Sequence, residues 1–265
     1  MASQQEQPTV SLGAAGTMPM VGFGTWQLTG PRCYDAVRHA LEVGYRHLDT
    51  ATVYSNEHEV GRAVRDSGVP REEIFITTKL PPGAAGRARQ TLEASLRALG
   101  TDYVDLWLIH WPPNGRAHPQ TWKELLAARD DGLTRAAGVS NYSLSQLDEL
   151  TAATGEPPQV NQIPWAPALH DETVLAGHRQ RGIVLEGYSP LRRTNLRDPV
   201  LTEIASRHGV TPAQVVLRWH LEHEIVVIPK SATPERIAAN FDLFSFSLSK
   251  EERQRIDALA AGRRR

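Results

Sequence analysis

The sequence predicts an α/β fold, and more narrowly a closed (β/α)8 TIM barrel with an N-terminal hairpin and two extra helices. Short apolar runs alternate with longer helix-like segments, and this strand–helix unit occurs eight times along the chain. The runs are short and mostly apolar, as expected for parallel strands that are buried on both faces. No Gly-x-Gly-x-x-Gly follows the first run, which disfavours a doubly wound dinucleotide-binding sheet. Eight such units in 265 residues favour the barrel.

The elements follow in chain order. Two short extended pieces between residues 9 and 20, around two glycines, predict a hairpin that can cap one end of the barrel. The first strand is expected at 21–24, and the first helix begins at Pro31, because proline suits the first helical position. The remaining strands are expected at 46–49, 74–79, 104–109, 133–139, 160–163, 184–188 and 225–228, and the remaining barrel helices at 56–67, 87–99, 119–130, 144–153, 171–181, 212–222 and 234–241.

Capping signals mark several helix starts. Ser143 is followed three residues later by Gln146, which is the capping-box pattern. Thr211 and Thr233 each precede a proline, a pattern that predicts a cap and a first helical turn. The same signals predict the two extra helices, at about 198–209 and 249–259.

The bulk composition is that of an ordinary globular protein. A net charge of −1 attracts neither nucleic acid nor an anionic membrane, and no apolar run is long enough to cross a bilayer. The polar start lacks a signal peptide's apolar core, and a single cysteine, Cys33, fits packing in a reducing cytoplasm. We expect one domain over residues 1–265 with 1–7 disordered and a solvated tail at 263–265, acting as a cytoplasmic monomer without nucleic-acid or membrane partners.

Four polar side chains lie at or just past the ends of successive predicted strands. Asp49, Lys79 and His110 end the second, third and fourth strands, and Tyr54 lies on the loop after the second. Active sites of (β/α)8 barrels form at the C-terminal ends of the strands, and neighbouring strands are about 5 Å apart. The four side chains are therefore expected to converge, although each taken singly also fits a cap, a surface position or core packing.

This set suits general acid catalysis and lacks a nucleophile. A phenol has a free pKa of about 10, and a nearby ammonium lowers it by stabilising the phenolate. Lys79 can act in this way on Tyr54, and Asp49 can hold the half-buried Lys79. His110 can then donate a hydrogen bond that aims a substrate carbonyl.

The last strand leads into a basic helix start that suits a phosphate. Lys230 lies just before this helix and Arg236 lies in its first turn, where the helix dipole disfavours a cation. The alternative is an arginine that pairs with Glu235 or with solvent. Strands seven and eight are the usual phosphate side of such barrels. Near them, Tyr188 can stack on a flat ring and Ser189 can bind a phosphate, while Ser140-Asn141 and Asn161-Gln162 end strands five and six and can hold a carboxamide.

At this point the chain resembles an aldo-keto reductase, over nearly its whole length. Four motifs carry the resemblance, and within the family the sequence is most similar to bacterial reductases of the 2,5-diketo-D-gluconate reductase type. The motifs are Gly44-Tyr45-Arg46-His47-Leu48-Asp49-Thr50-Ala51, Asp105-Leu106-Trp107-Leu108-Ile109-His110-Trp111-Pro112, Gly138-Val139-Ser140-Asn141-Tyr142 and Ile228-Pro229-Lys230-Ser231.

The resemblance implies reduction of aldehydes and ketones by hydride transfer from NADPH, with Tyr54 as proton donor and Asp49, Lys79 and His110 in the roles given above. It implies an alcohol:NADP+ oxidoreductase of class EC 1.1.1 that uses no metal. The same resemblance implies that the nicotinamide contacts Ser140, Asn141, Gln162 and Tyr188 and that the pyrophosphate contacts Ser189 and Leu191. It also implies that the 2′-phosphate contacts Lys230, Ser231 and Arg236, and that the adenine contacts Asn240.

Some features depart from the family pattern. Ala239 replaces the acidic residue that often precedes the adenine-contacting Asn240, which weakens one expected contact. The segment 191–198, with three arginines, is short for a strap over the cofactor, and its arginines either reach the pyrophosphate or are solvated. The chain after Leu259 is also short, which predicts an open pocket for small or flat carbonyl compounds. Its expected walls are Trp26, Tyr54, His110, Trp111 and Trp165.

Two other functions remain possible at this stage. One is a nicotinamide-binding module with little turnover that reports redox state to a partner protein. The other is a metal-dependent hydrolase that uses Asp49 and His110, although no further histidine or carboxylate at a strand end completes a ligand set. The sequence leaves the physiological substrate and the direction of the reaction open.

Overall fold

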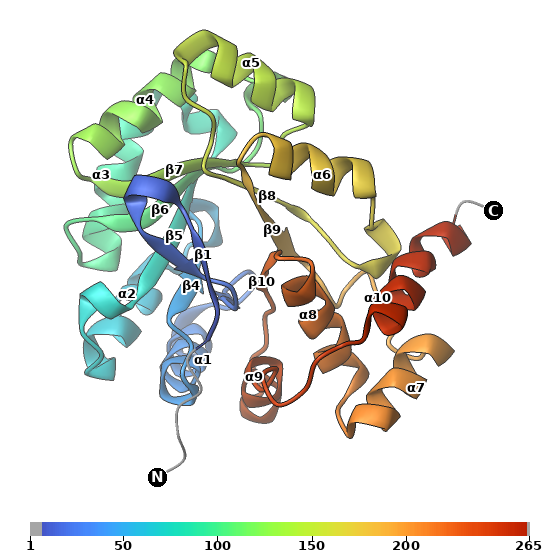
Figure 1. The fold of residues 1–265 in the computed structure, drawn as a ribbon. Helices are drawn as coiled ribbons and strands as arrows, with labels where there is room; N and C mark the ends of the chain where they lie inside the picture. The colour runs from blue at the N-terminus through green and yellow to red at the C-terminus, as the bar shows by residue number, and fades with distance from the viewer. Residues whose placement is uncertain (1–6, 264–265) are drawn as a thin grey trace.

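The computed structural model describes residues 7–263, with side chains to residue 260, and the chain there forms a (β/α)8 barrel (Figure 1). Parallel strands follow one another in chain order around the sheet, so that each strand pairs with the next. The barrel closes between its first and last strands, where the Gly22 N–H donates to the Val227 carbonyl at 2.9 Å. The strands are β3 (Phe23–Gly24), β4 (His47–Asp49), β5 (Phe75–Leu80), β6 (Val104–Ile109), β7 (Thr134–Ser140), β8 (Val160–Pro164), β9 (Val184–Tyr188) and β10 (Val226–Ile228).

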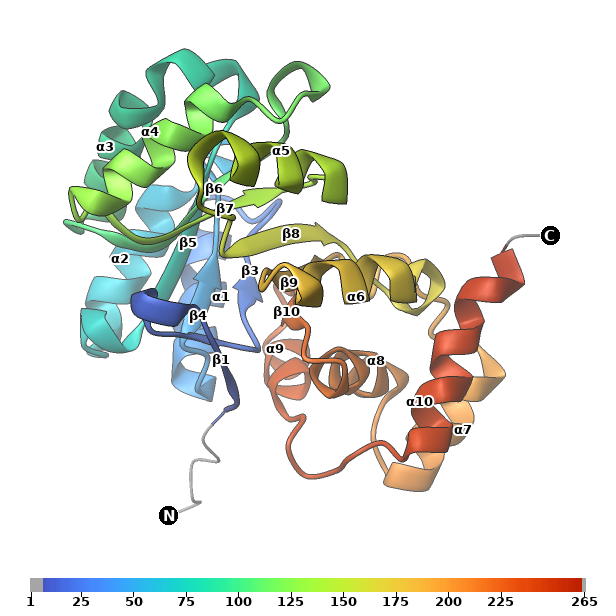
Figure 2. The same cartoon turned by 45° about the horizontal axis from the view of Figure 1, so that its top comes forward.

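The helices surround this barrel, and the two extra helices lie together on one side of it (Figure 2). The barrel helices are α1 (Gly30–Val43), α2 (Glu57–Ser67), α3 (Ala88–Leu99), α4 (Pro119–Asp130), α5 (Leu144–Thr154), α6 (Glu172–Gln180), α8 (Pro212–Glu222) and α9 (Pro234–Phe241), and the extra ones are α7 (Pro199–His208) and α10 (Lys250–Asp257). Each expected element is present, with ends that differ from the predicted ones by one or two residues, as usual where helices fray.

The predicted caps are confirmed at most helix starts. Ser143, Thr211 and Ser249 each form a complete capping box, and Asp198 accepts from the N–H of Val200 at 2.9 Å. Thr233 is the exception, because its side chain makes no capping hydrogen bond at the start of α9. The first N–H groups of α9 are therefore left without a side-chain cap.

The N-terminal hairpin contacts the end of the barrel that is opposite to the strand ends carrying Asp49 and Lys79. Its strands are β1 (Thr9–Ser11) and β2 (Thr17–Pro19). The Pro19 carbonyl accepts from Nδ1 of His47, at the start of β4, and the Leu12 carbonyl accepts from the Gln159 amide, just before β8. Residues 1–6, most of the segment expected to be disordered, lie outside the described part of the chain.

Large buried side chains fill the space between the strands and the helices. Trp107, Trp122 and Trp219 are fully buried there, and truncation of such residues usually costs about 3–5 kcal/mol. Gly61 of α2 permits a close approach to α3, because a Cβ atom there would lie 2.0 Å from the Leu99 carbonyl oxygen. Within residues 7–263, no helix is both long and apolar enough to span a membrane.

Candidate active site

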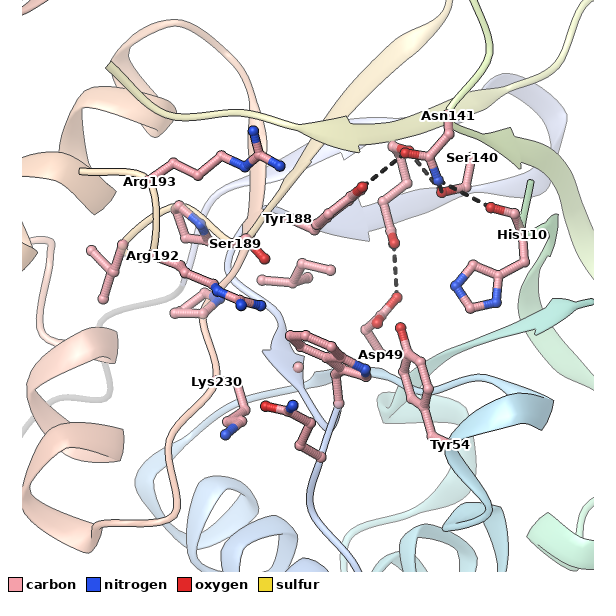
Figure 3. A pocket seen from close by; sticks show the side chains of 18 of the residues that line it. Asp49, Tyr54, His110, Ser140, Asn141, Tyr188, Ser189, Arg192, Arg193 and Lys230 are labelled. Carbon is pink, nitrogen blue, oxygen red and sulfur yellow. Dashed lines mark hydrogen bonds between the residues drawn. The ribbon is translucent and has the colours of Figure 1, made fainter. Parts of the chain in front are cut away.

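A cavity of about 610 Å³ opens at the C-terminal ends of the strands, where the polar residues were expected to converge (Figure 3). Asp49 lies at the end of β4. The loop after β4 carries Tyr54 to the same rim, and His110 directly follows β6. Its lining includes Asp49, Tyr54, His110, Trp26, Trp111, Ser140, Asn141, Gln162, Tyr188, Ser189, Leu191 and Lys230, all expected at the site.

Lys79 and Asp49 form a buried ion pair beneath this cavity. Nζ of Lys79 donates to both carboxylate oxygens of Asp49 at 2.7 Å and to the Thr50 carbonyl at 2.8 Å. Burial by itself would lower the pKa of the Lys79 ammonium, but the charge and hydrogen bond of Asp49, together with Tyr54 and Glu186, outweigh burial and raise this pKa above its ordinary value. Lys79 is therefore a fixed positive charge with three hydrogen bonds, as the sequence predicted.

Tyr54 lies above this ion pair, on the single 3₁₀ turn that follows β4. Its ring centroid is 5.2 Å from Nζ of Lys79 and 5.7 Å from the centroid of the His110 ring. Burial raises the pKa of the Tyr54 phenol, Lys79 lowers it, and the net shift is upward. The expectation that Lys79 brings this pKa below its ordinary value is therefore wrong, because desolvation of the phenolate outweighs the ammonium.

His110 is a neutral imidazole at neutral pH. Burial lowers its pKa, Lys79 lowers it further, and the resulting value is about 3. A neutral imidazole keeps one N–H donor and one acceptor nitrogen. The ring is thus suited to donating a single hydrogen bond into the cavity.

The amide and hydroxyl groups at or near the C-terminal ends of β7, β8 and β9 form a hydrogen-bond network. The Asn141 amide donates to the His110 carbonyl at 3.1 Å and to Oγ of Ser140 at 2.9 Å, and its oxygen accepts from the Tyr188 hydroxyl at 2.8 Å. The Gln162 amide donates to Asp49 at 2.8 Å. The sequence predicted these residues at the site but did not reveal that Gln162 also holds the carboxylate.

Two residues of this rim have left-handed backbone conformations. Asn141 has φ of 65° and Ser189 has φ of 55°. Such values are uncommon for residues other than glycine and often occur at functional sites. Here they direct the two side chains at the ends of β7 and β9 toward the cavity (Figure 3).

One side of the cavity is basic. Lys230, Arg192 and Arg193 line it, and the Arg192 guanidinium lies 5.4 Å from the centroid of the Trp26 ring. The two arginines come from the short segment whose role the sequence left open, and the structure brings them to the cavity. Arg236 does not line it: the side chain is exposed in the first turn of α9, where it forms no ion pair within the described part of the chain. Ser231, just before α9, and Asn240, near the end of α9, are mostly buried and also do not line the cavity.

The outer wall of the cavity is aromatic and open. Trp26 and Trp111 are 42% and 50% exposed, so solvent reaches both rings at this wall. The expectation for Trp165 is wrong, because this side chain is buried and packs edge-on against His170 away from the cavity. Gln27, Val53 and Pro190 also line the cavity, and no motif had distinguished them. Ile228 and Pro229, from the fourth motif, line it too.

A second buried polar group lies below the ion pair. Neither carboxyl oxygen of Glu186, on β9, has a hydrogen-bond partner among the described residues. Burial, and then the charge of Asp49, raises the pKa of Glu186 to about 8. Nε2 of His47 is 3.7 Å from this carboxyl group, and burial lowers the pKa of that histidine to about 4. Both groups are therefore uncharged at neutral pH, which the sequence did not reveal.

The hydrolase alternative finds no support at this site. Both oxygens of Asp49 already accept hydrogen bonds from Lys79 and Gln162. A metal ion bound to Asp49 and His110 would have to displace the buried ammonium of Lys79.

Comparisons with known proteins agree with this geometry. The model of the Aldo/keto reductase family matches residues 20–261. The chain is 42% identical to methylglyoxal reductase DkgA of Yersinia pestis, over 97% of this chain and 95% of that one. It is 42% identical to morphine 6-dehydrogenase of Pseudomonas putida, over 97% and 93% of the two chains.

Solved structures give the same result. The structure of an aldo-keto reductase of Bombyx mori in complex with NADP superposes with a TM-score of 0.89 at 34% identity, covering 96% of this chain and 93% of that one. The strand-end cluster, the barrel and these similarities all lead to one conclusion. The chain belongs to the aldo/keto reductase family of oxidoreductases.

Proposed function

We propose that this protein is an NADPH-dependent carbonyl reductase that converts aldehydes and ketones to alcohols, with Tyr54 as the general acid. The observation that carries the proposal is the convergence of Tyr54, His110 and the Lys79–Asp49 pair in one cavity with a basic side. The family match and the NADP complex of the Bombyx mori relative support the cofactor class.

The donor groups around the cavity fit an extended dinucleotide. Arg192, Arg193 and Lys230 present cations to a pyrophosphate, while the start of α9, which has no side-chain cap, and Arg236, which forms no ion pair with the described residues, suit a 2′-phosphate. Tyr188 stands where a nicotinamide ring can stack, with Ser140, Asn141 and Gln162 in reach of the carboxamide. Ser189 and Leu191 border the pyrophosphate, and Ser231 and Asn240 meet the ribose phosphate and the adenine.

The proposed chemistry divides between the cofactor and the protein. When bound, the reduced nicotinamide supplies a hydride to the carbonyl carbon. His110 donates its N–H to the carbonyl oxygen and so orients the carbonyl group. Tyr54, kept protonated by its raised pKa, gives the proton that completes the alcohol. Lys79 stabilises the phenolate that remains, and Asp49 keeps Lys79 charged and in position.

Trp26 and Trp111 form the substrate walls together with Tyr54 and His110 in this proposal. Their exposed rings suit small or flat carbonyl compounds. The names of the two relatives above motivate methylglyoxal and polycyclic ketones as the first compounds to assay. The assay measures reduction as the decrease in NADPH absorbance, with each compound of an aldehyde and ketone panel in turn.

Turnover of several aldehydes with NADPH would support the proposal. Tight NADPH binding with no turnover across the panel would contradict it and favour a redox-sensing module. Three expectations stay predictions: the single domain over residues 1–265, the monomeric state and the cytoplasmic location. Gel filtration with light scattering tests the monomeric state.

A further inference from the structure

We propose that His170, His223 and Asp257 form a zinc site that ties the C-terminal helix to the barrel. One potential ligand atom from each of these residues lies within 4.8 Å of the other two. The cluster lies away from the cavity, whose lining includes none of the three. It involves no group that the proposed reduction uses, so the inference does not depend on the proposed function.

Three segments that are distant in sequence meet at this cluster. His170 follows the 3₁₀ turn Pro167–Leu169 after β8, His223 follows the last residue of α8, and Asp257 is the last residue of α10. Figure 1 shows α10 at the edge of the barrel, beside α8 and the segment before α6. A metal ion here would join the C-terminal helix to both.

The distances are close to those of a bound divalent cation. Nε2 of His223 is 2.9 Å and Nε2 of His170 is 3.9 Å from Oδ1 of Asp257. Ligand atoms that each lie about 2.0–2.2 Å from a tetrahedral zinc are about 3.3 Å apart. The two observed distances bracket that value, so small side-chain rotations are sufficient. Two imidazoles and a carboxylate are the ligand types that zinc prefers.

His170 gives a second, independent indication of a ligand. Its side chain is only 9% exposed, yet among the described residues no hydrogen bond reaches either ring nitrogen, and Nδ1 is completely buried. Buried polar groups are almost always hydrogen-bonded, because burial without a partner costs free energy. Nε2 faces two acids, Asp257 at 3.9 Å and Glu172 at 3.8 Å. A cation between these groups would give Nε2, which receives no hydrogen bond from the described residues, a partner, whereas the buried Nδ1 would not contact it.

The surroundings hold the ligands in place, as an outer shell does in known metal sites. The Trp219 indole N–H donates to Oδ1 of Asp257 at 2.8 Å and fixes the carboxylate. The His170 ring packs edge-on against Trp165 and Trp219, at centroid distances of 6.0 Å and 5.5 Å. Asp257 is 26% exposed, which leaves a path for the ion and room for a water as fourth ligand.

Binding has a defined proton balance. A zinc-bound histidine must be neutral with a free lone pair on the ligating nitrogen. If the His223–Asp257 hydrogen bond carries its proton on Nε2, that proton moves to Nδ1 or to solvent when zinc binds. No bond to carbon changes, and no oxidant or reductant is needed.

The test uses the full-length protein, produced without a polyhistidine tag and stripped of metal with a chelator. Zinc is titrated in competition with a chromophoric chelator, and thermal unfolding is followed with and without zinc. We expect one zinc per chain, and an unfolding midpoint that rises by about 5 °C at a free zinc concentration of 100 times Kd. Hydrogen exchange should slow at residues 250–257 and 167–172.

Two variants remove ligands while keeping the local packing. Asp257→Asn retains an oxygen acceptor for the Trp219 N–H, and His170→Phe retains a ring against Trp165 and Trp219. We expect each to weaken zinc binding more than about tenfold while its metal-free unfolding midpoint stays close to that of the parent. Cobalt(II) should show intense visible bands of tetrahedral geometry in the parent protein and lose them in both variants.

Two control variants distinguish this site from others. His58→Gln removes a surface histidine that also lies beside an acid, at 3.9 Å from Glu59, and His110→Gln removes the histidine of the cavity. Both should bind zinc like the parent protein. Absence of stoichiometric zinc binding, retention of binding in both ligand variants, or loss of binding in His110→Gln would each overturn the proposal. Because all these readouts are independent of turnover, they stand even if the protein reduces no carbonyl.

Discussion

Nζ of Lys79 lies 2.7 Å from both carboxylate oxygens of Asp49, and neither side chain is more than 3% exposed. Such a pair is costly to break, because removal of one partner leaves the other charge buried and alone. The same pair is close enough to Tyr54 to influence its proton. Substitutions of Lys79 and Asp49, singly and together, can therefore separate the effect of this pair on protein stability from its effect on carbonyl reduction.

Lys79→Met should destabilise the protein by about 3–5 kcal/mol and remove most activity, because it leaves the Asp49 carboxylate buried without a counter-ion. The double variant Asp49→Asn/Lys79→Met should recover much of that stability without recovering turnover. Urea unfolding and NADPH-dependent reduction measure the two effects. Equal losses of stability in the single and double variants would show that the ion pair is not the source of the penalty.

Tyr54→Phe should lower kcat by about 10²–10⁴-fold, the range expected for loss of a general acid, while NADPH binding is unchanged. Phenylalanine removes the hydroxyl proton and keeps almost all of the contact area of the ring. Tyr34→Phe is the matched control, because it removes a surface hydroxyl that contacts Asp66. Near-normal reduction by Tyr54→Phe would remove Tyr54 from its proposed role.

Arg236→Ala should weaken NADPH binding by about tenfold or more and change NADH binding little, because a charge-assisted contact is worth about 1.5–3 kcal/mol. Arg236 is exposed and unpaired among the described residues, so its loss should not disturb the fold. Fluorescence titration with each cofactor measures the effect, and Arg32→Ala, exposed on α1, is the control. Equal weakening of both cofactors would argue against a 2′-phosphate site.

Glu186→Gln should make the protein more stable at pH 8 than the parent and change it little at pH 5. The pKa of Glu186 is about 8 in the folded protein and about 4.3 in the unfolded chain. The unfolded chain thus loses this proton first, and the stability that Glu186 contributes is present below pH 4.3 and lost as pH rises toward 8. The difference between the two proteins should grow by at most about 4 kcal/mol between pH 5 and pH 8.

Urea unfolding at several pH values measures this difference. Glu72→Gln, a change of an exposed carboxylate on the surface, is the control and should show no such trend. An unchanged difference between pH 5 and pH 8 would mean that Glu186 is ionised in the folded protein.

Most of the fold could be predicted because its signals are local. Strands such as β6 and β10 are short, mostly apolar runs, and helix starts such as Ser143 and Thr211 carry capping residues that satisfy the first N–H groups. The places of Asp49, Lys79 and His110 followed from the same rule. Parallel strands bring their C-terminal ends to one rim, so residues at those ends must meet.

Other features depend on burial and on contacts between distant segments. The sequence put Tyr54 beside Lys79, but the direction of its pKa shift depends on how far burial outweighs the ammonium. Trp165 was expected in the pocket wall, and whether an aromatic ring faces a cavity or the core depends on packing that no local pattern encodes.

Local pattern in the chain thus determined the element order, the barrel and the identity of the four polar groups at the strand ends. Three-dimensional packing decided that Gln162 holds Asp49, that Glu186 keeps its proton, and that Arg192 and Arg193 reach the cavity. It also brought His170, His223 and Asp257 together from three separate segments. The physical reason is that desolvation and charge–charge energies depend on distances across the fold, and positions along the chain do not specify these distances.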